Sequence, residues 1–204
     1  MVTQELLRKL CPQTPGGKLA MYVEPLNYAI AEFEITKVKE FLAQVAHESG
    51  GFIYTCELWG PTGPQIRYDA RADLGNTDPE AVRIAEAHGD KPGHFWRGRG
   101  LIQTTGYFNF CKARDALGID CVNHPEFLSS PLHAAQSAGL FWKQNGCDAI
   151  ADDFEKLTRR INGGLNGFED RKKYLARLNA ESLDVRIACS GRPGGARRHL
   201  RSRV

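Results

Sequence analysis

Two glutamates in one short stretch have the residue types and spacing of an acid and base pair. Residues 38–57 read V-K-E-F-L-A-Q-V-A-H-E-S-G-G-F-I-Y-T-C-E, with Glu48 before two glycines and Glu57 at the end. Apolar residues from Val38 recur at the spacing of a half-buried helix face, and Glu48 continues that face. A carboxyl group held against apolar side chains loses solvation of its charged form and keeps a proton more readily, as a general acid must.

Other interpretations of Glu48 stay open at this point. It could be a solvated residue at a frayed helix end, or the ion-pair partner of a buried arginine. His47-Glu48 also begins like the zinc-peptidase motif H-E-x-x-H, but position 51 is glycine. The second zinc ligand is therefore missing, which argues against a zinc peptidase.

The segment after Glu57 is dense in glycine, proline, aspartate and asparagine, which predicts loop structure over residues 58–90 with one short helix over 79–88. Long irregular connections inside a compact domain are usually functional or disordered. Trp59 and Tyr68 favour a substrate-groove wall, because aromatic rings offer flat faces to sugar rings and polar edges for hydrogen bonds. Both rings could equally anchor the loop to the core.

Residues 94–110, H-F-W-R-G-R-G-L-I-Q-T-T-G-Y-F-N-F, form a second polar segment punctuated by glycines. It lacks G-x-x-x-x-G-K-[ST] and a preceding apolar strand, which argues against a nucleotide site. Its neutral polar side chains suit hydroxyl-rich ligands and the positioning of a water. The candidates for substrate contact here are Gln103, Thr104, Thr105, Tyr107 and Asn109.

Apolar periodicity predicts a mainly α-helical protein. At 204 residues and 42% hydrophobic composition, the chain can bury one substantial core, with room for a small lobe. Pro25 should break or kink one helix, and the Thr36 hydroxyl should cap another. Besides residues 79–88, helices are expected over residues 3–10, 18–34, from about 36 to the glycines at 50–51, 107–117, 131–145, 152–161 and 168–178. His133 is expected to be structural.

The ends of the chain and the cysteines give further expectations. The amino terminus does not read as a signal peptide, and no apolar run is long enough to cross a membrane. Six cysteines without C-x-x-C spacing indicate free, buried thiols. Residues 186–204 carry six arginines and no acid. We expect a catalytic domain over residues 1–183 and a basic, flexible tail over 184–204, which could be simply solvated or touch an anionic envelope.

Four motifs in this order resemble the family 19 glycoside hydrolases, which include plant-type chitinases and many phage endolysins. They are A-H-E-S-G-G-F, R-G-R-G-L-I-Q-T-T-G-Y-F-N-F, R-R-I-N-G-G-L-N-G and E-D-R-K-K-Y, between about Leu26 and Leu178. The stretch C-E-L-W-G-P-T-G-P-Q-I-R-Y-D-A-R-A-D-L-G-N-T is similar to the compact bacterial and phage branch. The resemblance implies a mostly helical, lysozyme-like, two-lobed domain with a substrate cleft and little or no sheet.

The resemblance also implies roles for single residues. Glu48 matches the general acid, Glu57 the second carboxylate, and Thr105 a hydroxyl that helps to hold the attacking water. Polar positions that contact substrate or water match Gln103, Asn109 and Asn162. Arg171 matches a basic residue that tunes the surroundings of the acid.

One departure concerns the base. Many short family members read E-N-L-N-Y at the second carboxylate, whereas this chain reads E-L-W-G. Asp69 in R-Y-D-A-R is therefore a reserve candidate for the base. Its alternative interpretation is a structural ion pair with Arg67 or Arg71.

These observations predict an inverting glycosidase of the endolysin type that hydrolyses β-1,4 bonds of peptidoglycan. The alternatives are a chitinase with the same machinery and a glycan-binding module without catalysis. We expect a monomer that needs no cofactor or metal, binds a peptidoglycan-like or chitin-like polysaccharide and does not bind nucleic acid. It would be made in the cytoplasm and reach the cell wall after holin-dependent release.

Overall fold

A computed structural model describes residues 1–181 of the chain. Residues 182–204 lie outside the described part, and with them the predicted tail, the predicted domain end at 183 and Cys189. The described residues are mostly helical, with two isolated β-bridges, Cys56 to Arg99 and Arg99 to Thr104. The α-helices are α1 Gln4–Leu10, α2 Gly16–Ala20, α3 Val23–Glu32, α4 Val38–Glu48, α5 Gly63–Ile66, α6 Pro79–Ala87, α7 Pro92–Phe95, α8 Tyr107–Leu117, α9 Pro131–Gln144, α10 Phe154–Asn162 and α11 Phe168–Asn179. The 3-10 helices are η1 Arg67–Ala70, η2 Ala72–Leu74, η3 Pro125–Ser129 and η4 Cys147–Ile150.

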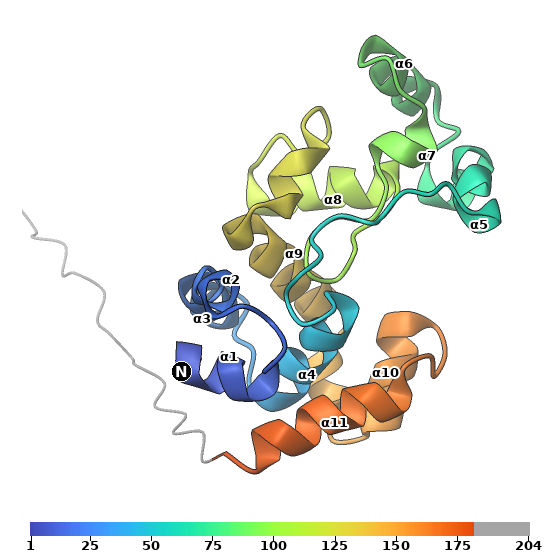
Figure 1. Ribbon diagram of the computed structural model, residues 1–204. Helices are drawn as coiled ribbons and strands as arrows, with labels where there is room; N and C mark the ends of the chain where they lie inside the picture. The colour runs from blue at the N-terminus through green and yellow to red at the C-terminus, as the bar shows by residue number, and fades with distance from the viewer. Residues whose placement is uncertain (182–204) are drawn as a thin grey trace, which may run out of the picture.

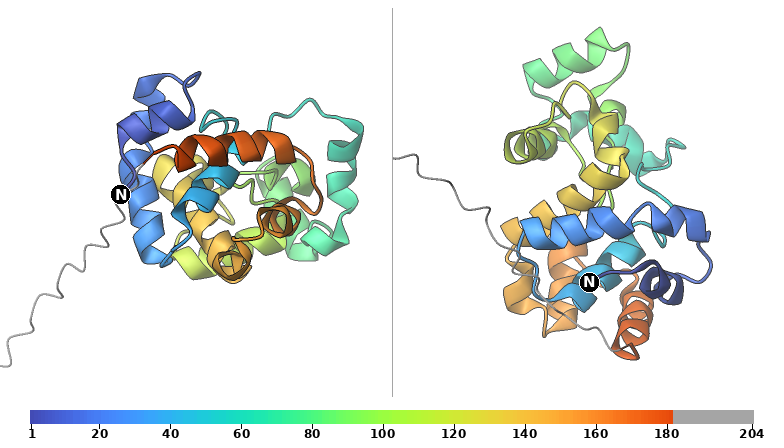
Figure 2. Two further views of the ribbon diagram at one scale, coloured as in Figure 1. Left: turned by 90° about the horizontal axis from the view of Figure 1, so that it is seen from below. Right: turned by 90° about the vertical axis from the view of Figure 1, so that its left-hand side faces the viewer.

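The helices gather into two lobes with separate hydrophobic cores, as the resemblance implied (Figure 1). The larger core joins α1–α4 with α11, and the smaller core joins α6, α7 and α8. Helix α9 serves both, because Trp142 is buried in the larger core and Leu140 packs against the smaller one. Figure 2 shows α9 running between the lobes in its right-hand view. The mainly helical, two-lobed fold class is thus confirmed.

Helix α4 is the centre of the larger lobe and packs against α11. Its predicted apolar face is buried, with Phe41, Leu42 and Val45 fully inaccessible. The predicted Thr36 cap is wrong: the helix has no side-chain cap from its own N-cap residue. The Asp148 carboxylate from η4 instead accepts the backbone N–H groups of Thr36 and Lys37, at 3.2 and 3.0 Å. A carboxylate is well placed at the positive end of a helix.

The predicted helix over 18–34 is two helices, α2 and α3, separated at Met21–Tyr22. Pro25 lies in the first turn of α3 and kinks nothing. A proline is tolerated there because first-turn N–H groups have no partner within the helix. The remaining predicted helices appear within two residues of their expected ends.

The described cysteines are free thiols, as expected: Cys11, Cys56, Cys111, Cys121 and Cys147. No helix among residues 1–181 is long and apolar enough to cross a membrane. Within the same residues, no cluster of three or more His, Cys, Asp or Glu side chains could hold a metal ion.

Candidate active site

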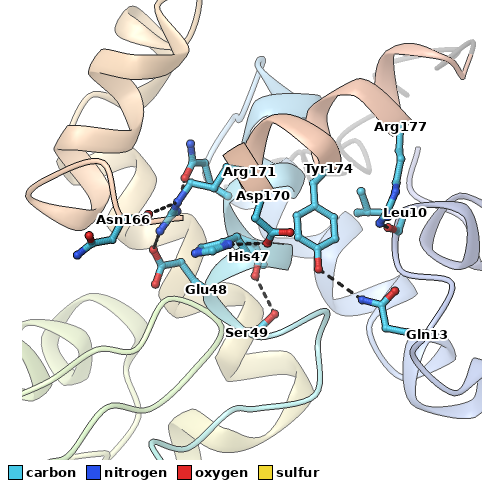
Figure 3. A network of polar contacts seen from close by, with 12 residues as sticks. Leu10, Gln13, His47, Glu48, Ser49, Asn166, Asp170, Arg171, Tyr174 and Arg177 are labelled. Atoms are coloured by element: carbon cyan, nitrogen blue, oxygen red, sulfur yellow. Dashed lines mark hydrogen bonds and ion pairs between the residues drawn. The ribbon is translucent and has the colours of Figure 1, made fainter. Parts of the chain in front are cut away.

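Glu48 lies at the carboxyl end of α4 and is held by a buried arginine. Arg171 Nη2 of α11 donates to Glu48 Oε1 at 2.5 Å, as Figure 3 shows. The arginine side chain is 1% exposed and the glutamate side chain 19%. The expected apolar surroundings of Glu48 are therefore only half right, because its immediate neighbour is a cation. The alternative interpretation of Glu48 as the ion-pair partner of a buried arginine is confirmed. One oxygen is occupied by Arg171, which leaves Oε2 for a ligand.

Arg171 is fixed by a buried polar network that joins three helices. Its Nη1 donates to Gln44 Oε1 on α4, and its Nε donates to the backbone oxygen of Asn166 at 3.4 Å. Gln44 Nε2 in turn donates to Thr158 Oγ1 of α10 at 3.0 Å. Gln44 and Thr158 are both fully inaccessible. Buried polar groups are costly unless paired, so this network holds the guanidinium in one place.

A second pair connects the same two helices beside Glu48. His47 Nδ1 and Asp170 Oδ2 are 2.7 Å apart. Gly167, at φ +71°, allows this contact, because a Cβ there would lie 2.1 Å from the His47 ring. Two consecutive residues of α4 thus pair with two consecutive residues of α11: His47 with Asp170, and Glu48 with Arg171.

Glu57 is held differently, by neutral donors from the smaller lobe. Gln65 Nε2 donates to Oε1 at 2.9 Å, and the backbone N–H of Gly98 donates to Oε2 at 3.0 Å. The Tyr68 hydroxyl lies 3.4 Å from Oε1. Burial, followed by the negative charge of Glu57, raises the pKa of Tyr68. These donors orient the Glu57 side chain and place no formal positive charge next to it.

The reserve candidate Asp69 serves the loop structure. Its Oδ1 accepts the backbone N–H of Gly93 at 2.8 Å, and Arg71 pairs with Asp73 rather than with Asp69. In the described part of the chain, no salt bridge joins Asp69 to Arg67 or Arg71, so the alternative interpretation of Asp69 as an ion-pair partner is wrong. Asp69 lines a second cavity of about 480 Å³ together with Trp59. The Trp59 ring lies 4.9 Å from the ring of His94 and 6.0 Å from the ring of Tyr68. Trp59 therefore both packs against neighbouring rings and lines a cavity.

The polar loop after Gly98 lines a cavity of about 620 Å³. Gln103, Thr104, Thr105 and Asn109 all face it, as the sequence predicted for a binding surface. The lining continues through α8, α9 and α10 to Ile161, which precedes Asn162. Neither Glu48 nor Glu57 lines this cavity itself.

Gly98 connects the Glu57 site to that cavity. It donates to the Glu57 carboxylate on one side, while on the other a Cβ would lie 2.7 Å from Gln103 Oε1 and 3.3 Å from Thr105 Oγ1. Glycine at this position permits the close approach of the two segments. The base candidate and the polar loop are therefore adjacent.

Two predicted contacts lie elsewhere. Tyr107 lines neither cavity and packs on Trp96 at 4.9 Å in the smaller lobe. Burial, with an added hydrogen bond to Cys111, raises its pKa to about 12. Tyr107 is the first residue of α8 and packs partly buried against the smaller core, and its role as a substrate contact stays a prediction. Asn162 is exposed at the end of α10 and also lies outside both cavity linings.

Sequence reasoning missed three residues of the site: Gln44, Gln65 and Lys112. Gln44 precedes Glu48 by one helical turn, so its polarity on an apolar helix face was the available signal. Gln65 completes a capping box with Thr62, which the T-x-x-Q spacing could have indicated. Lys112 lies on α8 and lines the cavity three residues after Asn109.

Sequence comparison identifies the family of this site. A glycosyl hydrolase family 19 domain-containing protein of Haemophilus influenzae is 37% identical over 164 residues, which cover 71% of this chain and 79% of the relative. The chain belongs to glycosyl hydrolase family 19. It is accordingly a glycosidase, a hydrolase acting on glycosyl bonds. A scan against models of protein families finds no match.

Further family 19 proteins resemble parts of the chain. An Arabidopsis thaliana endochitinase is 33% identical over 129 residues, 63% of this chain but only 40% of the plant protein. Chitinase C from Streptomyces griseus shares the fold, with a TM-score of 0.62 and 23% identity over 88% of this chain and 75% of its own. A second bacterial family 19 chitinase matches equally well, with 88% of this chain and 96% of its own covered.

Proposed function

We propose that this family 19 glycosyl hydrolase is an endolysin-type enzyme that cleaves β-1,4 bonds of peptidoglycan glycan strands with inversion. The observation that carries the mechanism is the contrast between its two carboxylates, one ion-paired on a helix end and the other held by neutral donors. The loop around Glu57 supports the substrate class, through its similarity to the compact bacterial and phage branch. Action at the cell wall after release from the cytoplasm is part of this proposal.

Glu48 acts as the general acid. Arg171 holds Oε1, so Oε2 is the oxygen free to reach the leaving-group oxygen of the glycosidic bond. Donation of a proton from Oε2 to that oxygen lets the glycosidic bond break while water attacks from the opposite face of the ring.

Glu57 acts as the base that activates water on the opposite face of the ring. Inverting glycosidases place their carboxyl groups roughly 6.5–9.5 Å apart so that this water fits between them. Three donors keep the Glu57 carboxylate oriented without a formal positive charge. Thr105, whose hydroxyl donates to the Gln103 backbone oxygen at 2.8 Å, retains lone pairs that can accept from the water.

The first test is Glu48→Gln, which keeps the shape of the side chain and removes the transferable proton. Loss of general acid catalysis should lower kcat by about 10²–10⁴-fold while leaving sedimentation with sacculi intact. Glu57→Gln should do the same for the base. A parent protein that binds sacculi without releasing reducing ends would instead support the glycan-binding alternative, and the mutant would then behave as the parent.

The second test separates peptidoglycan from chitin, the substrate named for the plant relatives. Purified sacculi and soluble N-acetylglucosamine oligomers are digested in parallel, and mass spectrometry identifies the sugar at each new reducing end. Activity on sacculi supports the proposal; turnover of the oligomers alone makes the protein a chitinase. Proton NMR of the first product anomer tests inversion in either case.

A further inference from the structure

The 620 Å³ cavity is neutral except at one point. Its lining consists of apolar residues, amides and hydroxyls from the polar loop, α8, α9 and α10. Among the described residues that line it, Lys112 alone carries a formal charge, and no acidic side chain lines it. A neutral sugar polymer needs no such charge, because its hydroxyl and acetamido groups pair with neutral donors and acceptors.

The charge of Lys112 is not used within the protein. No carboxylate among residues 1–181 forms a salt bridge with it, whereas Arg114 on the same helix pairs with Asp115 at 2.8 Å. Lys112 is exposed and stands one turn after Asn109, so both side chains lie on the same face of α8. An unpaired ammonium group at a binding surface is available to a ligand anion.

The neutral side chains of the cavity point to the same conclusion. Several of them already donate a hydrogen bond to a backbone carbonyl, which leaves their oxygen atoms as acceptors for sugar O–H and N–H groups. These are Gln103, Thr105, Asn109, Ser137 and Asn145. Lys112 is the cationic donor among the side chains that line this cavity. An ammonium group binds a carboxylate more strongly than it binds a hydroxyl.

The second cavity has the opposite character. It is lined by Asp69 and Asp90 as well as Lys91, and Asp90 pairs with His94 at 2.6 Å. An anionic substituent would meet carboxylates there. Of the two cavities, the one next to Gly98 is the one whose lining carries a positive charge and no carboxylate.

We infer that Lys112 forms a subsite for an anionic substituent on the glycan, such as a free carboxylate of a peptidoglycan peptide stem. The inference rests on the proposed hydrolysis of peptidoglycan and makes Lys112 a specificity-determining residue. Charge complementarity discriminates between related substrates, and here it selects a carboxylate-bearing strand over neutral chitin.

The test uses two soluble chitin derivatives with the same backbone, anionic carboxymethyl-chitin and neutral glycol-chitin. The measured quantity is the ratio of kcat/KM on the first to that on the second at low salt. Lys112→Gln should lower this ratio about 1.5- to 5-fold, the range expected for an exposed charge pair. Lys112→Arg should preserve the ratio, and added salt should reduce the parent's ratio towards that of Lys112→Gln.

The matched control is Arg114→Gln, which removes one positive charge from the same helix without touching the cavity. It should leave the ratio unchanged. An unchanged ratio in Lys112→Gln, or an equal fall in both variants, overturns the inference. If Lys112→Gln lowers the ratio but the parent protein does not cleave sacculi, only the proposed peptidoglycan activity is overturned.

Discussion

The surroundings of Glu48 and Glu57 differ in almost every physical respect. Glu48 ends a long helix, and its cationic partner Arg171 is anchored through Gln44 and Thr158 in the larger lobe. Glu57 lies in a loop of the smaller lobe, and its donors are an amide, a phenol and a backbone N–H. Glu48 is positioned by an ion pair with a buried arginine, and Glu57 is positioned by hydrogen bonds from neutral groups.

This contrast predicts that substitutions near the two glutamates will affect different properties, the unfolding free energy near Glu48 and the reaction rate near Glu57. A buried ion pair is costly to break from one side, because the remaining charge stays buried without a partner. Replacing one neutral donor of a carboxylate lowers the unfolding free energy less, because no buried charge loses its only partner. Loss of the buried cation Arg171 should therefore lower the unfolding free energy, whereas substitutions around Glu57 should mainly slow the reaction.

The largest effect is expected for Arg171→Met. It leaves Gln44 Oε1 and Glu48 without their donor, and loss of one partner from a buried pair costs about 3–5 kcal/mol of unfolding free energy. Urea denaturation monitored by circular dichroism measures this loss. Lys172→Met is the matched control: its ammonium is exposed and pairs with exposed Glu169, so its loss should cost less than about 1 kcal/mol. Equal losses in the two variants would contradict the contrast.

Gly98→Ala should affect catalysis more than stability. The added Cβ would lie 2.7 Å from Gln103 Oε1 and 3.2 Å from Gln103 Cβ, so the Gln103 side chain must move beside the donors that hold Glu57. Misplacement by about 1 Å can cost roughly 100-fold in rate, and we expect a fall of that order in kcat/KM on the preferred glycan. Gly17→Ala, where a Cβ would meet nothing within 4 Å, should leave the rate unchanged. A Gly98→Ala enzyme with full activity would show that these donors do not position Glu57.

The smallest effect is expected at alkaline pH, where a buried thiol in each of the two cores should lower the unfolding free energy to a similar extent. Burial raises the pKa of Cys11 in the larger core and of Cys121 in the smaller core to about 12, from a reference of 9.0. A raised folded-state pKa contributes stability that is complete below pH 9.0 and is lost as pH rises towards about 12. Each thiol should contribute a loss of about 1 kcal/mol by about pH 10.

Replacing either thiol by alanine should flatten this decline in unfolding free energy, measured by urea titration at several pH values. Similar changes for Cys11→Ala and Cys121→Ala are expected because both thiols are buried to a similar extent. A decline that neither variant alters would assign the alkaline sensitivity to other groups.

Local sequence was sufficient for the helices that carry the site. The apolar spacing from Val38 predicted the buried face of α4 with Glu48 at its end, and the glycines at 50 and 51 marked its stop, both with positive φ. Glycine spacing around 94–110 likewise indicated a polar loop, and Gln103, Thr104, Thr105 and Asn109 do face one cavity. These features depend on neighbours within a few residues, which spacing reveals.

Partners distant in sequence were decided only by the tertiary structure. The cap of α4 comes from Asp148, and Glu57 meets Gly98 beside the β-bridge between Cys56 and Arg99. Motif order pointed to Arg171, but not to its fixation by Gln44 and Thr158.

For Tyr107, residue type suggested a sugar contact, while its place at the start of α8 turned the ring against Trp96. The sequence by itself thus determined which segments become helices and which side chains can do chemistry. The packing of the two lobes decided which of those side chains meet, because a side chain's partners depend on where distant segments pack.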